Sequence, residues 1–245
     1  MPINYEPIDT TTDVATTRTL LHEVIPLTGT IVSGTYGTFP NDDNIKNYSH
    51  GMFQSVYDYP YLSSSANHIF DLTAGFDESS PLSGSVSSVQ ETKKINMYNQ
   101  FSQVLLGYTG STNRVRLFES DLTLDEDSPM KETIFVNLSR LLTKDEIKKG
   151  SVSITLGTAS WANPFSGVRT FTDAGAAENA GTLNTIGGDY GILSSSTGVG
   201  GVIFYQAGVM VLTSSIWAGT TDFFSQSGTA RTIDNQLVSG SISGS

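Results

Sequence analysis

The chain has 245 residues, 38% of them hydrophobic, and it carries 13 Lys and Arg against 24 Asp and Glu, a formal net charge of -11. This apolar content suffices for a sizeable core in one large all-β unit or two smaller domains. The acidic balance argues against a broad nucleic-acid-binding face, and the absence of cysteine excludes disulfides, thiolate catalysis and cysteine-ligated metal sites.

The N-terminal part divides into a polar and an apolar stretch. Residues 1–17 are polar and rich in Thr, which predicts an extended arm. They lack the basic flank and apolar run of a signal peptide, and no run in the chain approaches the ~20 residues of a membrane span, which predicts a soluble protein without a membrane partner. Residues 18–37 are apolar and β-branched with Gly and Pro between them, as in short strands joined by turns. His22 in this run is interpreted as a structural residue.

The segment from residue 42 to residue 75 combines aromatic residues, histidines and aspartates. Its apolar residues recur near a 3.6-residue period, which predicts an amphipathic helix that Asn41 or Asp42 caps and Pro60 ends. The run HIFDLT that follows predicts a strand ending at Gly75. The residues that define the helical period are Ile45, Tyr48, Met52, Phe53 and Val56.

The clearest local signal predicts a helix over residues 89–106. Ser88 and Glu91 have the spacing of a capping box, and Gly107 stands where a helix would end. The apolar stripe is interpreted as core rather than as a cofactor contact, with additional apolar residues predicting burial on more than one side. The stripe comprises Ile95, Tyr98, Phe101 and Leu105, and the additional residues are Met97, Val104 and Leu106.

From residue 115 to residue 156 the pattern is mainly that of strands. Strands are predicted around Val115 and Leu117, around Leu122 and Leu124, and in the run TIFVNLSRLL. The acidic loop 125–132 lacks the spacing of a calcium-binding loop, which favours a solvated turn. Thr143 and Glu146 predict a single helical turn that ends at Gly150. Strict alternation of Val152, Ile154 and Leu156 then predicts a half-buried strand.

The last third begins with a loop-rich excursion over residues 157–190, in which Trp161, Phe165 and Phe171 are apolar anchors. Two strands are predicted next, joined by the glycine turn STGVGG, with Gly208 as a bulge or bend in the second. No Lys follows in the frame of a phosphate-binding loop, so a hairpin is favoured over phosphate binding. Residues 218–245 form a polar C-terminal tail.

No constellation in the sequence predicts an enzyme. There is no G-x-S-x-G motif, and His22, His50 and His68 do not form an H-E-x-x-H pair. A paired-carboxylate glycosidase stays open as an alternative, because two acids can meet from any positions, but no pair is favoured. We therefore expect no catalytic, cofactor-binding or metal-binding residue.

These patterns together predict a mainly β protein, an antiparallel sandwich or barrel-like structure with two or three short-to-medium helices. A single domain is expected over residues 18–217, with a subdivision near 107–115 as an alternative. The arm at residues 1–17 and the tail at 218–245 flank it.

Five long stretches resemble virion structural proteins of large tailed phages of marine bacteria, particularly myoviruses with contractile tails. The stretches are TRTLLHEVIPLTGTI, NIKNYSHGMFQSVYDYPYLSSSANHIFDLTAG, KKINMYNQFSQVLLG, FVNLSRLLTKDEIKKGS and GVIFYQAGVMVLTSSIW. The resemblance covers most of residues 17–217, although many similar proteins continue into a further β-rich C-terminal region. It implies a structural subunit of the virion that is assembled in the host cytoplasm with other virion proteins and copies of itself.

Within that resemblance, tail or baseplate is the first expectation. A head decoration, neck or minor capsid protein is the alternative, and a glycan-binding or receptor-binding module of a tail fibre is a second one. The family's aromatic stretch around Met52 to Tyr61 implies a helix and turn that lock the core or contact a neighbouring subunit. The candidate interface residues are Tyr57, Tyr59, Tyr61, Trp161 and Trp217. Packing within the chain is the competing interpretation for the tyrosines.

Overall fold

The computed structural model describes residues 43–48, 52–81, 83, 89–109, 114–121, 127–158, 166–176 and 184–217. Several predictions fall outside these residues and stay predictions. They concern the arm at 1–17, the strands over 18–37, the tail at 218–245, the strand around Leu122 and Leu124, the Ser88–Glu91 capping box, and the positions of Trp161, His22 and His50.

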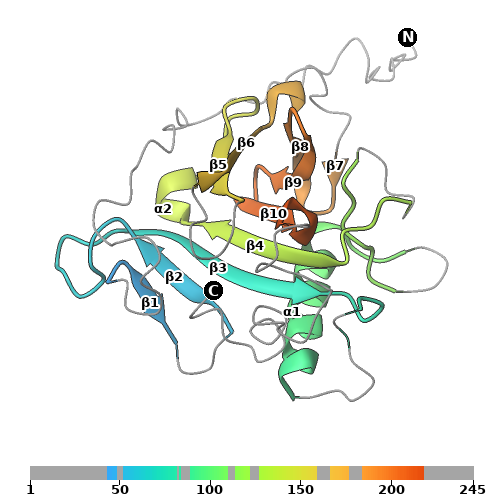
Figure 1. Cartoon of the computed structure of the whole chain (residues 1–245), viewed down its shortest axis with the longest axis horizontal. Helices are drawn as coiled ribbons and strands as arrows, with labels where there is room; N and C mark the ends of the chain where they lie inside the picture. Colours follow the sequence, from blue (N-terminus) through green and yellow to red (C-terminus); the bar gives the residue numbers. More distant parts are fainter. Residues whose placement is uncertain are drawn as a thin grey trace, which may run out of the picture.

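The described residues form one antiparallel sheet with helices on it, which confirms the predicted mainly β fold (Figure 1). The strands are β1 (Ile45–Asn47), β2 (Gln54–Tyr57), β3 (His68–Phe76), β4 (Glu132–Leu138), β5 (Ser153–Gly157), β6 (Val168–Thr172), β7 (Asn184–Thr185), β8 (Gly188–Ser195), β9 (Gly198–Phe204) and β10 (Val209–Thr213). Their order in the sheet is β1-β2-β3-β4-β10-β9-β8-β6-β5, and β7 pairs with β8. The helices are α1 (Val89–Leu105) and α2 (Arg140–Thr143), with short 3-10 helices η2 (Ala174–Ala176) and η3 (Ser214–Trp217).

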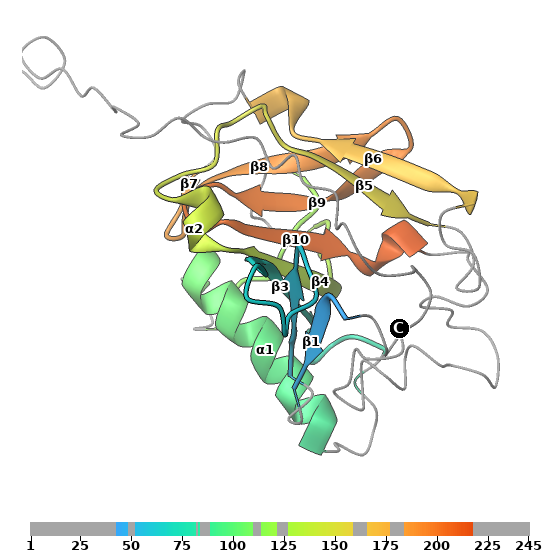
Figure 2. The same ribbon diagram turned by 90° about the vertical axis from the view of Figure 1, so that its left-hand side faces the viewer.

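The sheet has an apolar core on each face. Alternation along β4 sends Phe135 to one core and Val136 and Leu138 to the other. Figure 2 shows α1 lying along one side of the stacked strands, with β5 and β6 at the end of the stack farthest from β1. The second core contains side chains of both β4 and β10 and receives the partly buried Ile154 and Leu156 of β5, so the sheet curls around it.

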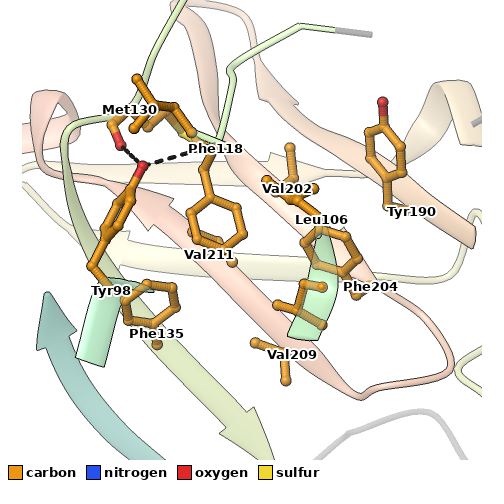
Figure 3. Packing of buried hydrophobic residues seen from close by; sticks show 12 residues of the cluster. Tyr98, Leu106, Phe118, Met130, Phe135, Tyr190, Val202, Phe204, Val209 and Val211 are labelled. Carbon is orange, nitrogen blue, oxygen red and sulfur yellow. Dashed lines mark hydrogen bonds between the residues drawn. The ribbon is translucent and has the colours of Figure 1, made fainter. Parts of the chain in front are cut away.

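The first core is rich in aromatic rings (Figure 3). Tyr98 of α1 packs edge-on against Phe118, with ring centroids 5.4 Å apart. Its hydroxyl donates a 2.9 Å hydrogen bond to the Met130 carbonyl and accepts one from the Phe118 amide at 3.0 Å. These bonds tie the segments 114–121 and 127–131 to the helix, and burial raises the pKa of Tyr98 above its ordinary value.

The predicted helix over 89–106 is confirmed, since α1 covers Val89–Leu105 and Gly107 follows in a left-handed conformation with φ +84°. The expectation of burial on more than one side is wrong for Val104, which is 67% exposed. Lys94 and Ser102, by contrast, are fully buried. The helix rests on the sheet through one face only, and that face includes two polar residues.

The predicted helix from Asp42 to Pro60 is wrong, because β1 and β2 occupy its described part. Residues of β2 pair with β3, placing Gln54 opposite Leu72 and Ser55 opposite Asp71. The apolar spacing fitted a helical period, but hydrogen bonds to a strand further along the chain outweigh that local preference.

Two other local predictions need correction. Thr143 ends a helical turn instead of starting one, because it is the last residue of α2 and Lys144 after it adopts a φ of 49°. The excursion over residues 157–190 contains β6, which pairs with β5 along five residues. The strand predictions ending at Gly75 and over 152–156 are confirmed by β3 and β5, and the run TIFVNLSRLL holds β4 followed by α2.

The glycine-rich pair of strands is in fact three strands. The turn after Ser195 joins β8 to β9, which confirms the predicted hairpin. Gly208 lies in a second turn with φ +70° between β9 and β10, so the chain reverses where a bulge or bend was expected. Val115 forms an isolated bridge with Tyr108 and is not part of a strand.

Candidate functional site

A group of polar and aromatic side chains, partly exposed except for the buried Ser55, lies on and beside β2 and β3, next to the edge strand β1. We call it the aromatic site, and it comprises Tyr48, Ser55, Tyr57, Tyr61, His68 and Asp71. The strand register places Lys46, Ser55 and Asp71 in one row across the three strands. Because side chains that are level in neighbouring strands share a face of the sheet, this row presents its polar groups on the same side.

A β-bulge brings His68 into this group. Val56 pairs with Phe70, but Tyr57 pairs with His68, so Ile69 is an extra residue in β3. An extra residue reverses the alternation of side chains, and it turns His68 to the face that carries Asp71 and Tyr57. His68 Nε2 lies 2.9 Å from Asp71 Oδ1, and its ring centroid lies 5.5 Å from that of Tyr57.

The Asp71 carboxylate joins the group through hydrogen bonds. Ser55 Oγ donates to Asp71 Oδ1 at 2.5 Å, and the Tyr48 hydroxyl lies 3.2 Å from Ser55 Oγ. Because a carboxylate only accepts hydrogen bonds, His68 Nε2 carries the hydrogen and Nδ1 faces away from this bond. A serine hydrolase needs the histidine between serine and aspartate, whereas here the aspartate is in the middle. The arrangement therefore orients Ser55 and His68 without activating the serine.

The loop over residues 58–67 borders the aromatic site and is closed by a clamp. The Asp58 carboxylate accepts hydrogen bonds from the Asn67 amide at 2.6 Å and from Asn67 Nδ2 at 2.9 Å. The Asp58 amide in turn donates to the Asn67 carbonyl at 3.1 Å. The side-chain bond from Asn67, and then its backbone bond, lower the pKa of Asp58 below its ordinary value. The clamp fixes both ends of the loop.

The predicted interface residues end up in different environments. Tyr59 and Tyr61 are exposed on the clamped loop together with Leu62, which is 86% exposed. Tyr57 is half-buried at the base of the loop, where its ring centroid lies 6.4 Å from that of Tyr61. Trp217 is only 7% exposed and donates from Nε1 to the Gly157 carbonyl at 3.0 Å, which places it in the second core and away from the surface.

Sequence reasoning missed Ser55, Asp71 and the clamp. The clamp has a weak signal, since Asp58 and Asn67 bracket a stretch of Pro and Ser residues and both favour turns. The contact between Ser55 and Asp71 has no local signal, because it depends on the pairing of two strands and on a bulge.

A second polar group is buried between β5, β6 and β9. Asp173 accepts hydrogen bonds from the amides of Gly150 and Val152, each at 2.8 Å, and from the Tyr205 hydroxyl at 2.9 Å. Burial and then the charge of Asp173 raise the pKa of Tyr205. Lys149 forms an ion pair with Asp189 beside the Tyr205 ring. Asp173 and Tyr205 are fully buried and bonded to each other, which suits an anchor of the chain better than a reaction centre.

Within the described ranges, no three His, Asp or Glu side chains gather in a way that could hold a metal ion. No helix of that part of the chain is both long and apolar enough to cross a membrane. Comparison with family models, with curated proteins and with solved structures found no match to this chain.

Proposed function

We propose that this chain is a non-catalytic structural subunit of a phage particle, in the tail or baseplate, that binds neighbouring virion proteins through the loop over residues 58–67. The observation that supports an assembly role is the clamped loop itself, which holds Tyr59, Tyr61 and Leu62 out into solvent. The phage setting rests on the resemblance of five stretches of the sequence to virion structural proteins.

Because of the clamp, binding through the loop costs little conformational entropy. Two bonds from Asn67 to Asp58 fix its ends before any partner arrives, so less conformational entropy is lost on binding. A further hydrogen bond of 2.9 Å from the Tyr61 amide to the Asp43 carbonyl ties the loop to the segment just before β1. Tyr and aliphatic side chains held in this way act as anchors that insert into an apolar pocket of a partner.

A head decoration, neck or minor capsid protein is the alternative within the same class. The loop would serve there in the same way, since its chemistry selects a protein pocket and not a position in the particle. Cross-linking mass spectrometry on intact particles separates the two, because it identifies the neighbours of this chain and its copy number.

The matched test compares Leu62→Asp with Leu141→Asp. Leu141 of α2 is 85% exposed, almost the same as Leu62 at 86%, but it lies outside the loop. Each variant is supplied to assembling particles in competition with the unchanged chain, and its share in purified particles is measured by quantitative mass spectrometry. We expect Leu62→Asp to be depleted at least about tenfold, as for an interface anchor, and Leu141→Asp to be incorporated normally. Equal incorporation of both variants, with equal melting temperatures, contradicts the proposal.

A further inference from the structure

We propose that the aromatic site binds a neutral pyranose sugar. The inference rests on the juxtaposition of Tyr57, His68 and Asp71 on β2 and β3. Of the residues that it uses, Tyr61 also belongs to the loop over residues 58–67. A contact with an apolar protein surface would not use the polar groups of this site. The inference therefore assigns the site a small-molecule ligand.

Tyr57 and Tyr61 supply the apolar part of such a site. Their ring centroids are 6.4 Å apart and the rings are tilted by 42°, so two aromatic rings lie side by side at an angle. A pyranose ring has an apolar face of C–H groups that packs on an aromatic ring, while its hydroxyls point outward to polar groups. Tyrosine suits this contact because a rigid ring carries a polar tip.

Asp71 and His68 supply the polar part. Each side chain is 30% exposed, and their mutual bond uses Asp71 Oδ1 and His68 Nε2. Within the described part of the chain, Asp71 Oδ2 and His68 Nδ1 have no protein partner. Asp71 Oδ2 accepts hydrogen bonds, and His68 Nδ1 does so in the neutral imidazole that carries its hydrogen on Nε2. Each of these two acceptors can therefore receive a hydrogen bond from a sugar hydroxyl.

The acceptors are held in place before a ligand arrives. Ser55 is buried beneath them and donates to Asp71, and Tyr48 in turn contacts Ser55. Ser55, Tyr57, His68 and Asp71 stand on the paired strands β2 and β3, which favours a fixed geometry. The side chains that accept hydrogen bonds from a ligand have therefore lost their rotational freedom before it binds, so binding costs less conformational entropy.

The charge around the site favours a neutral sugar over an acidic one. Asp71 would repel a carboxylate or sulfate, and the chain as a whole has a net charge of -11. Lys46, the cation of the same row, lies over the Tyr48 ring at 5.0 Å from its centroid. The expected ligand therefore has hydroxyl groups and no negative charge.

Saturation-transfer difference NMR on the full chain tests the proposal, with the methyl glycosides of glucose, galactose and mannose and with N-acetylglucosamine as probes. A single sugar of this size is expected to bind with a dissociation constant on the order of 1–10 mM. At least one probe should receive saturation. Tyr57→Ala and Asp71→Asn should each weaken binding at least about tenfold, whereas Tyr108→Ala, an exposed tyrosine after α1, should leave it unchanged.

Asp71→Asn keeps the shape of the side chain, so it tests the acceptor even if Tyr57→Ala impairs folding. The proposal is overturned if no probe receives saturation at about 50 mM, at least about five times the expected dissociation constant, or if saturation persists unchanged in a folded Asp71→Asn variant. Leu62→Asp should retain sugar binding, so failure of the assembly role and failure of the sugar site give different results.

Discussion

The Tyr205 hydroxyl lies 2.9 Å from Asp173 Oδ2 and donates a hydrogen bond to it inside the protein. Both residues directly follow strands, β9 and β6, and Asp173 also accepts from the amides of Gly150 and Val152. One carboxylate thus holds together the ends of two strands and the segment that leads into β5. Because the group is fully buried, each of its hydrogen bonds matters for stability.

Tyr205→Phe should therefore lower the free energy of unfolding by about 1–3 kcal/mol, because a buried carboxylate loses one of its three donors. Urea denaturation at pH 7 measures the change. Tyr108→Phe removes a hydroxyl from an exposed tyrosine and should change the free energy by less than about 0.5 kcal/mol. Coincident unfolding curves for Tyr205→Phe and the unchanged chain would show that the bond contributes nothing.

Lys94 should make stability rise with pH. Burial lowers its pKa from 10.5 to about 8, and its ammonium has one long bond, 3.4 Å, to the Met52 carbonyl. Below pH 8 the lysine is charged in both states and the folded state bears the desolvation cost. Between pH 8 and 10.5 the folded state releases the proton first, so this contribution to stability increases.

Lys94→Met should remove that cost and stabilise the protein at pH 7 by up to roughly 3 kcal/mol, which corresponds to the difference between the two pKa values. The gain should shrink as the pH rises from 8 to 10.5. Guanidinium denaturation of the unchanged chain and of Lys94→Met across this pH range measures the difference between their free energies of unfolding. The contributions of other titrating groups cancel in that difference. A gain that does not depend on pH would point to improved packing alone.

The Asp58 clamp should be visible in an NMR titration. Bonds from Asn67 lower the pKa of Asp58 below 3.8, so the clamp contributes fully above that pH and is lost as the pH falls through the lower folded-state value. Asn67→Ala removes the side-chain donor and should return the pKa of Asp58 toward 3.8. It should also speed hydrogen exchange in the loop 58–67, whereas Glu78→Ala should not. An unchanged titration of Asp58 would exclude the bond in solution.

The stacked pair of Phe101 and Phe135 should account for part of the stability of α1. Their ring centroids are 4.2 Å apart with the planes at 7°, but Phe101 is only partly buried. Phe101→Ala should cost about 3 kcal/mol, the lower end of the range for buried phenylalanine. Val104→Ala on the exposed side of the same helix should cost less than about 0.5 kcal/mol. Thermal melting of the two variants measures the difference between these costs. Equal melting temperatures would mean that Phe101 contributes no more to stability than Val104.

Local patterns in the sequence were enough to predict the elements that depend mainly on interactions between residues close in sequence. The helix α1 has a sustained period and a glycine just after its end, and β5 has strict alternation, so both were predicted within a few residues. Turn chemistry likewise identified the hairpin between β8 and β9. In each case the deciding interactions join residues close in sequence.

Tertiary structure decided what depends on distant residues. The stretch from Ile45 to Val56 fits a helical period, yet pairing with β3 makes it strands, and the bulge at Ile69 then brings His68 to Asp71. Trp217 was a candidate interface residue, but it is buried, and Lys94 on α1 is buried as well. Periodicity describes the faces of a single element, whereas the partner that covers each face, and the polar groups that meet there, are chosen by packing between elements far apart along the chain.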